Sequence, residues 1–300
     1  MKRHTLTPLA IAAVIALGLA ACGDDSDSPS ATELTTGETL PPVDTPPVDT
    51  DTVDTGGDGI QHPTGADEIV LRIGYEGGFV PVEYVFLDLP TLLVTGDGRV
   101  IVQGPQIAIY PGPLLPNLQE RTISEDGIQA LLRLARDHDL VRDVTYEDDP
   151  LIADAPYTVV TISADGATYE HEAYALGIGG DAETDEARAQ LASFVAAATD
   201  IVNAAGADTL GPEVPYETTS YLIRATVADE ATAPDDIAPE IVDWPADAPV
   251  RLADARECAT VPAESFTDLF ASATQLTWFA DAGVTYQLTV KPQLPGVPAC

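Results

Sequence analysis

The three cysteines are the residues whose chemistry the sequence indicates most directly. Cys22 lies in the stretch LGLAACGDD, at the end of an apolar run, whereas Cys258 and Cys300 lie in the last part of the chain. A thiol can be acylated, bind a metal, attack a substrate or form a disulfide, and its surroundings decide which. The small residues Ala20 and Ala21 let a processing enzyme approach the backbone before Cys22. We therefore expect the thiol of Cys22 to react differently from the thiols of the other two cysteines.

The residues before Cys22 are ordered like an export signal. A basic region at residues 2–4 precedes an apolar run at residues 9–20, which is too short for a standard transmembrane helix. The sequence Leu19-Ala20-Ala21-Cys22 resembles the lipobox of bacterial lipoproteins. This resemblance implies that residues 1–21 are a cleaved signal peptide and that Cys22 becomes a lipidated N-terminus, with palmitate-type chains holding it in the cell membrane. The alternative is an ordinary secretory signal with an incidental cysteine.

Cys258 and Cys300 form an even pair in a chain predicted to be exported, which favours one disulfide. Such a bond would join residue 300 to the start of a predicted C-terminal helix. Loop-closure entropy puts its effect on the unfolded chain at about 4 kcal/mol. The alternative is a metal site or a catalytic thiol, but no histidine lies near Cys258 in the sequence.

The histidines and carboxylates give no recognisable catalytic pattern. His62 falls in a linker, and His138 falls in the last turn of a predicted helix, where a partial positive charge suits the dipole. In YEHEAY, strand alternation places Glu170 and Glu172 on one face and His171 on the other, so a zinc site would need ligands from elsewhere. Neither a nucleophile elbow nor a phosphate-binding or dinucleotide-binding loop is present. We predict no catalytic residue, no metal ligand and no cofactor.

The charge balance is strongly acidic, with 49 acidic residues, 13 basic residues and a net charge of -36. Such a chain repels nucleic acid and stays soluble, so we predict no nucleic-acid partner. Aspartates could supply oxygen ligands for calcium, yet the acidic clusters lack the spacing of a known calcium loop. We therefore expect a solvated acidic surface rather than a calcium site.

Residues 22–67 have the composition of an unfolded linker. The repeats PPVDT, PPVDT and DTVDT at residues 41–55 favour polyproline II, and regularly spaced aspartates repel one another. This segment has too few large apolar residues to bury a core. About 45 residues at ~3.1 Å each would reach roughly 140 Å. The repeat could instead be a recognition motif, or its threonines could carry glycans.

The elements that must position these residues are mostly hairpins. Turn signals at residues 96–98, 164–166 and 281–283 each lie between strand-like runs, and further strands are predicted near 68–75 and 221–228. Helices are predicted after Ser124, over about 184–205 and from about 262. Ser124 is placed to cap the first helix with its side chain, and apolar residues at helical spacing predict its buried stripe: Ile128, Leu131, Leu132 and Ala135.

The fold class is therefore α+β with antiparallel hairpins. We predict one domain over 68–210 and a smaller one, or a C-terminal half, over 211–300. Two related halves are one interpretation of the strand–helix–hairpin order that both share, and unrelated halves are the other.

Taken together, the sequence predicts a membrane-anchored extracytoplasmic lipoprotein that is a non-enzymatic binding or envelope-support module. Its partners would be the membrane, through the lipid on Cys22, and an envelope protein or ligand that the sequence does not specify. The lipobox and linker style resemble those of acidic lipoproteins from GC-rich bacteria, a resemblance that implies no activity. The alternative is a secreted hydrolase that uses carboxylates.

Overall fold

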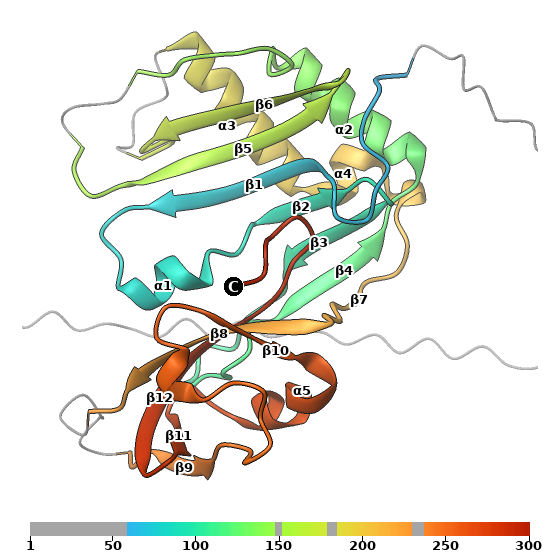
Figure 1. The fold of residues 1–300 in the computed structure, drawn as a ribbon. Helices are drawn as coiled ribbons and strands as arrows, with labels where there is room; N and C mark the ends of the chain where they lie inside the picture. Colours follow the sequence, from blue (N-terminus) through green and yellow to red (C-terminus); the bar gives the residue numbers. More distant parts are fainter. Residues whose placement is uncertain (1–58, 148–151, 179–184, 230–236) are drawn as a thin grey trace, which may run out of the picture. The chain divides into compact units, whose positions relative to one another are not determined.

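The computed structural model describes residues 59–147, 152–178, 185–229 and 237–300 (Figure 1). By its internal contacts the chain divides into two units, Met1–Thr55 and Gly56–Cys300, and all described residues belong to the second. Among these residues no helix has both the length and the apolar character needed to cross a membrane. The predicted α+β class is confirmed, and Cys22 and the PPVDT repeats lie outside the described residues.

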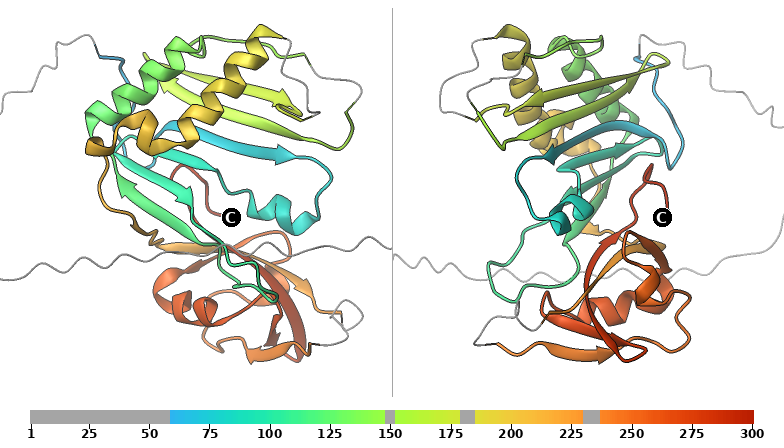
Figure 2. Two further views of the ribbon diagram at one scale, coloured as in Figure 1. Left: turned by 180° about the vertical axis from the view of Figure 1, so that it is seen from behind. Right: turned by 60° about the vertical axis from the view of Figure 1, so that its left-hand side comes forward.

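The larger layer is an antiparallel sheet of order β6-β5-β1-β2-β3-β4-β7. Its strands are β1 (Ile69–Gly77), β2 (Leu92–Thr95), β3 (Arg99–Gln103), β4 (Leu118–Thr122), β5 (Pro156–Ala164), β6 (Ala167–Tyr174) and β7 (Val214–Pro215). The helices α2 (Glu125–Asp137), α3 (Glu186–Thr199) and α4 (Ile201–Ala205) cover one face, which we call the helix-covered face (Figure 2). The turn η1 (Ala207–Thr209) follows α4.

The helix-covered face holds the main apolar core. The predicted stripe of α2, formed by Ile128, Leu131, Leu132 and Ala135, is buried as expected from helical periodicity. Phe194 of α3 is fully buried in the same cluster. The predicted long helix is interrupted at Asp200, which is the C-cap of α3 and the N-cap of α4. Gly206, with a φ of 94°, is the C-cap of α4.

The second sheet has the order β10-β8-β12-β11-β9. Its strands are β8 (Ser220–Val227), β9 (Glu240–Asp243), β10 (Ala259–Pro262), β11 (Thr277–Asp281) and β12 (Val284–Pro292). The turn η3 (Leu252–Asp254) precedes β10, and α5 (Ala263–Ser272) follows it. Trp244, Phe266, Phe270 and Phe279 pack ring against ring in the core. One pairing, between β9 and β11, is parallel.

The two sheets do not share one topology. In the larger sheet the hairpin after α2 joins the central strands through its first strand, because β5 pairs with β1. In the smaller sheet the hairpin after α5 joins through its second strand, because β12 pairs with β8. The two halves that the sequence order suggested are therefore arranged differently.

Three further segments lie near the second sheet, and one of them crosses the face opposite the helices, which we call the open face. Residues 293–300, the strap, leave β12 and cross this face (Figure 1), where Leu294 packs with Leu93, Ile101 and Leu118. The short helix α1 (Val82–Leu87) contacts β12, with the Lys291 ammonium 5.2 Å from the centre of the Phe86 ring. The loop 104–117 links β3 to β4 and packs Leu114 and Leu115 into the second core.

The packed chain begins earlier than composition indicated. Ile60, which the sequence placed in the linker, is 3% exposed and belongs to the main core. The Gln129 side chain holds its backbone on both sides: Ile60 N donates to Oε1 at 2.8 Å, and Nε2 donates to Ile60 O at 2.8 Å. A linker-like composition does not reveal this segment because a side-chain amide, rather than a run of apolar residues, fixes it.

Candidate functional site

The predicted disulfide between Cys258 and Cys300 is present, with the two Cα atoms 5.4 Å apart. Its position is structural. It ties the end of the strap to the residue before β10, where Cys300 N also donates to Thr260 Oγ1 at 3.2 Å. The bond therefore holds the strap in place and supplies no free thiol for catalysis.

His171 is fully buried on the helix-covered face, as strand alternation predicts, while Glu170 and Glu172 are exposed. Its Nε2–H donates to Leu140 O at 2.8 Å, so Nδ1 accepts the hydroxyl of Tyr146 at 2.9 Å. Burial lowers the pKa of His171 and raises that of Tyr146 to about 12. Both rings are thus neutral and satisfied, which is typical of a core polar pair.

The other histidines also have structural partners. His138 caps the end of α2 and lies 2.9 Å from Gln190 Oε1 through Nδ1. His62 is packed rather than part of a free linker: its Nδ1–H donates to Pro63 O at 2.7 Å, and Nε2 lies 3.1 Å from Glu125 Oε2. Burial alone would raise the pKa of Glu125, but hydrogen bonds from Gln129 and His62 hold it below its usual value.

No group of three histidine, cysteine, aspartate or glutamate side chains within the described part of the chain is placed to hold a metal ion. Glu147 is described, whereas Asp148 and Asp149 of the same acidic run lie outside the described residues. The geometry of the described residues therefore gives no support for a calcium site.

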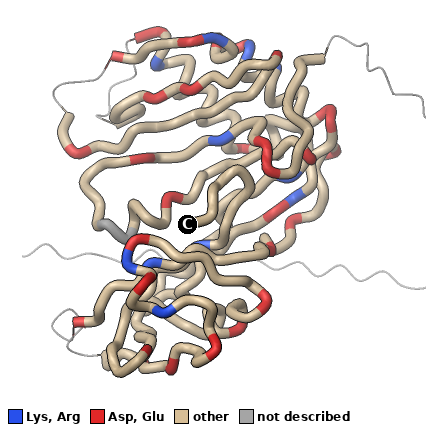
Figure 3. Tube along the Cα trace, in the orientation of Figure 1, with Lys and Arg blue, Asp and Glu red and all other residues tan. Residues whose placement is uncertain are grey.

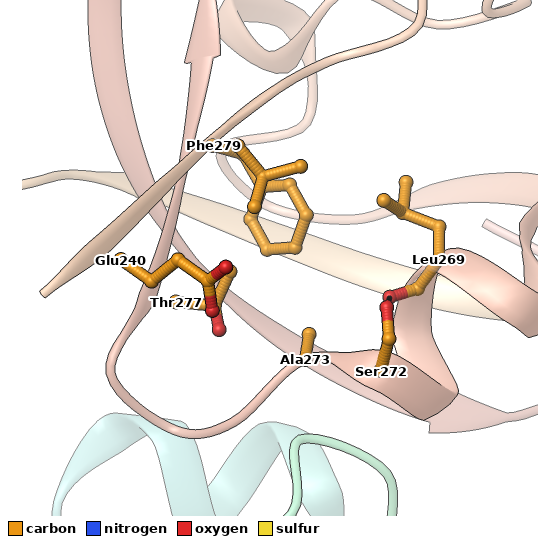
Figure 4. Close-up of a pocket in the computed structure, with 7 residues that line it drawn as sticks. Glu240, Leu269, Ser272, Ala273, Thr277 and Phe279 are labelled. Carbon is orange, nitrogen blue, oxygen red and sulfur yellow. Dashed lines mark hydrogen bonds between the residues drawn. The ribbon is translucent and has the colours of Figure 1, made fainter.

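Two cavities lie among the described residues. The smaller, about 80 Å³, lies beside α5 and is lined by Glu240, Val242, Leu269, Ser272, Ala273, Thr277 and Phe279 (Figure 4). It has one carboxylate and room for only a few water molecules. The larger, about 550 Å³, is an open hollow between the strap and residues that include Asp67, Arg99 and Glu217. Neither cavity is lined by a histidine or a cysteine.

Shifted pKa values gather instead around Arg72 on the open face. The Arg72 guanidinium donates to Glu76 at 2.9 Å and to Asp88 at 3.3 Å. Burial raises the pKa of Asp88, although Arg72 and Lys291 act in the opposite direction. Burial also lowers the pKa of Lys291, the only lysine among the described residues. The two cations and two carboxylates in this cluster cancel in charge.

Directly outside this cluster lies an unusually apolar part of the surface. Its large side chains project from α1, the loop before it and the loop 104–117, and they are Phe79, Val80, Tyr84, Val85, Ile107, Ile109 and Tyr110. Phe79 is 88% exposed and Tyr84 is 64% exposed. We call these residues the apolar surface. Clustered exposure of this kind marks an interaction site, whereas single exposed apolar residues do not.

Local sequence explains why these side chains point outward. Gly77 and Gly78 have φ values of 72° and 80°, which turns the chain out of β1 toward Phe79. Helix α1 has six residues, and its inward side carries Phe86 against Lys291. Tyr84 and Val85 therefore lie on the outer side.

The loop 104–117 is held beside α1. At its base Gly104 N donates to Asn117 O at 2.8 Å, and Gln103 Nε2 donates to the carbonyl of Leu89 at 3.0 Å. Leu89 follows α1 closely in the chain. Both views of Figure 2 show the loop near α1. The two segments thus form one region of the surface.

The apolar surface is poor in charge although the chain is strongly acidic. No charged residue occurs from Val100 to Gln119, and Glu83 is the single charged residue from Gly77 to Leu87. Acidic residues are spread over both sheets elsewhere (Figure 3). Sequence reasoning did not identify this site, although the long uncharged stretch was a signal that could have found it.

Searches against protein-family models, curated proteins and solved structures gave no match to this chain. The interpretation of the site therefore rests on its own geometry and chemistry.

Proposed function

We propose that this chain is a lipid-anchored extracytoplasmic protein that acts by binding, through the apolar surface, and not by catalysis. The observation that carries the proposal is the exposure of Phe79, Tyr84, Val85 and Ile107 in two segments whose one charged residue is Glu83. Burying such side chains against a partner is favourable by about 25 cal/mol per Å² of apolar area. A chain that keeps them in water, on a body otherwise rich in carboxylates, is suited to binding there.

The anchor in this proposal is the lipid on Cys22. The basic region, the apolar run and the lipobox-like LAAC support it, and the linker that follows would hold the folded body outside the membrane. The paired Cys258 and Cys300 suit an oxidising compartment beyond the cytoplasm.

The alternative, a carboxylate-dependent hydrolase, has weaker support. Glu170 and Glu172 are neighbours on one face of β6, and burial together with the hydrogen bond that protonated Glu172 donates to Glu170 raises the pKa of Glu172. Both side chains are nevertheless exposed, and neither lines the two cavities described above. Exposed carboxylates lack the enclosed site that a general acid requires to hold substrate and exclude water.

Metabolic labelling with radioactive palmitate tests the anchor. The wild-type chain should incorporate label, and its mature N-terminal peptide should begin at Cys22 and carry a diacylglyceryl group. Cys22→Ala should incorporate none, whereas the double variant Cys258→Ser/Cys300→Ser should label like wild type. A wild-type chain cleaved elsewhere, with Cys22 free of lipid, would overturn the proposal.

A further inference from the structure

We propose that the apolar surface rests on the lipid bilayer itself, with the exposed side chains of Phe79, Val80, Tyr84, Val85, Ile107, Ile109 and Tyr110 entering the zone between headgroups and acyl chains. This inference rests on the proposed lipid anchor at Cys22, since that anchor keeps the body next to a membrane. It adds an orientation: the part of the surface that carries α1 and the loop 104–117, rather than the outer side of α2, α3 and α4, is turned toward the bilayer.

The form of the surface favours a bilayer over a protein partner. Tight protein interfaces place their anchor residues in pockets of complementary shape. Here the exposed residues project from loops and the outer side of a short helix, and none of them lines the two cavities described above. Projecting side chains need no preformed complement when the partner is a deformable layer of lipid.

The residue types also suit the headgroup region. Phe79, Val85 and Ile107 offer only apolar surface, which gains by leaving water. Tyr84 and Tyr110 have an apolar ring with a polar tip, and tyrosine is enriched where membrane meets water. The combination matches a shallow insertion, in which hydroxyl groups stay at headgroup level.

The length of chain before the described body permits this contact. The roughly 36 residues between Cys22 and Gly59 could reach about 110 Å at polyproline II spacing. A compact body of this size has a radius of gyration of about 18 Å and therefore a width of roughly 45 Å. The anchor can consequently remain in the bilayer while any part of the body, including the apolar surface, turns toward it.

The net charge of the chain determines which lipid headgroups it can approach. With a net charge of -36 the chain is repelled by anionic lipids, and this repulsion acts over about 10 Å at 0.1 M salt. Repulsion is weakened at the apolar surface, because residues 100–119 are uncharged and Arg72 and Lys291 offset Glu76 and Asp88, which leaves Glu83 as the charged residue between Gly77 and Leu87. We therefore expect docking on zwitterionic lipid, weakened by anionic lipid and restored by salt.

Tryptophan quenching in vesicles tests the contact with the full, lipidated chain. The variant Phe79→Trp is reconstituted into phosphatidylcholine vesicles with and without brominated acyl chains. The matched control is Val202→Trp, on α4 of the helix layer, where Val202 is 38% exposed. The native Trp244 and Trp278 are 5% and 7% exposed and provide a common background.

We expect brominated lipid to quench the added emission of Trp at 79 about twofold or more and to leave that of Trp at 202 unchanged. Including one-third phosphatidylglycerol should reduce the quenching in low salt, and 0.5 M salt should recover it. Adding Val85→Asp to Phe79→Trp should abolish the quenching while the chain still floats with vesicles.

Two outcomes separate this proposal from the anchor on which it rests. If the chain floats with vesicles but Trp at 79 is not quenched, the docking is wrong and the anchor stands. If the emission of Trp at 79 instead changes with the amount of protein per vesicle, and equally with and without brominated lipid, the surface binds a second copy of the chain. In that case the docking is again wrong. If the chain does not float and Cys22 carries no lipid, the anchor itself is wrong.

Discussion

The two faces of the seven-stranded sheet are covered in different ways. The helix-covered face meets α2, α3 and α4, whose buried residues recur at helical spacing, and its core is closed. The open face is crossed by the strap, and the apolar surface lies on α1, the loop before it and the loop 104–117. The helix-covered face therefore stabilises the fold, while these surface segments leave apolar residues available for binding.

The largest expected effect of a mutation lies on the helix-covered face. Phe194 is fully buried, so Phe194→Ala should leave a cavity and lower the free energy of unfolding by about 3–5 kcal/mol. Urea denaturation followed by far-UV circular dichroism measures this loss. A loss below about 1 kcal/mol would mean that this face is not the main source of stability.

The strap should contribute less to the free energy of unfolding than the helix-covered face does, because it covers a smaller apolar cluster. In Cys258→Ser/Cys300→Ser the strap loses its covalent tie, and the free energy of unfolding should fall by about 2–4 kcal/mol. Hydrogen exchange should increase at residues 293–297 before it increases in α2. Wild-type protein treated with a dithiol reductant is the control and should match the double variant. Unchanged exchange in both would show that Leu294 holds the strap without the disulfide.

Acid should weaken the helix-covered face through His171. Its pKa is lowered in the fold, so unfolding takes up a proton between that lowered pKa and the unfolded value of about 6.5. The free energy of unfolding should be level above that pH and should fall below it, by at most about 1.4 kcal/mol per pH unit. Denaturation curves from pH 7.5 to 5.0 measure the slope.

His171→Gln is the control for this pH dependence, because an amide can replace both hydrogen bonds without titrating. The variant should remove the slope between pH 6.5 and 5.0. Some carboxylates have lowered pKa values, among them Asp97 and Glu125. Their contribution to the free energy of unfolding is lost only at more acidic pH. A slope that persists in the variant would assign the effect to another group.

The smallest effect on stability is expected on the apolar surface. Phe79→Ala is the same substitution as Phe194→Ala at a side chain that is 88% exposed, so the free energy of unfolding should change by less than about 0.5 kcal/mol. The same urea experiment measures it. A loss comparable to that of Phe194→Ala would mean that Phe79 belongs to a core and not to a binding surface.

The helix-covered face could be predicted from the sequence because its signals are local. The α2 stripe recurs at helical spacing, and the turns at Asp165-Gly166 and Ala282-Gly283 take the positive φ values that such hairpins require. The expected side-chain cap by Ser124 is absent, whereas Asp185 caps α3 by accepting from Arg188 N at 2.9 Å. Local sequence patterns thus predicted the helices and hairpins more reliably than they predicted individual hydrogen bonds.

The open face could not be predicted in the same way, because its contacts join residues far apart in the chain. Leu294 packs against Leu93, and Lys291 lies over Phe86, but neither pairing leaves a periodic pattern in the sequence. Helix α1 is too short to show one. Of the predicted site residues, Cys258 and Cys300 are paired by the structure, and the lipidation of Cys22 stays a prediction.

The strap also has a consequence for the order in which the chain acquires its structure. Gly296 lies so close to Ile69 that an added Cβ would come within 2.9 Å of that side chain. A chain that is synthesised from its N-terminus will form β1 long before residue 296 arrives. During that interval Leu93, Ile101 and Leu118 stay uncovered, and late closure of so long a loop is slow. Folding of this protein therefore includes a period in which an incomplete sheet must be kept from aggregating.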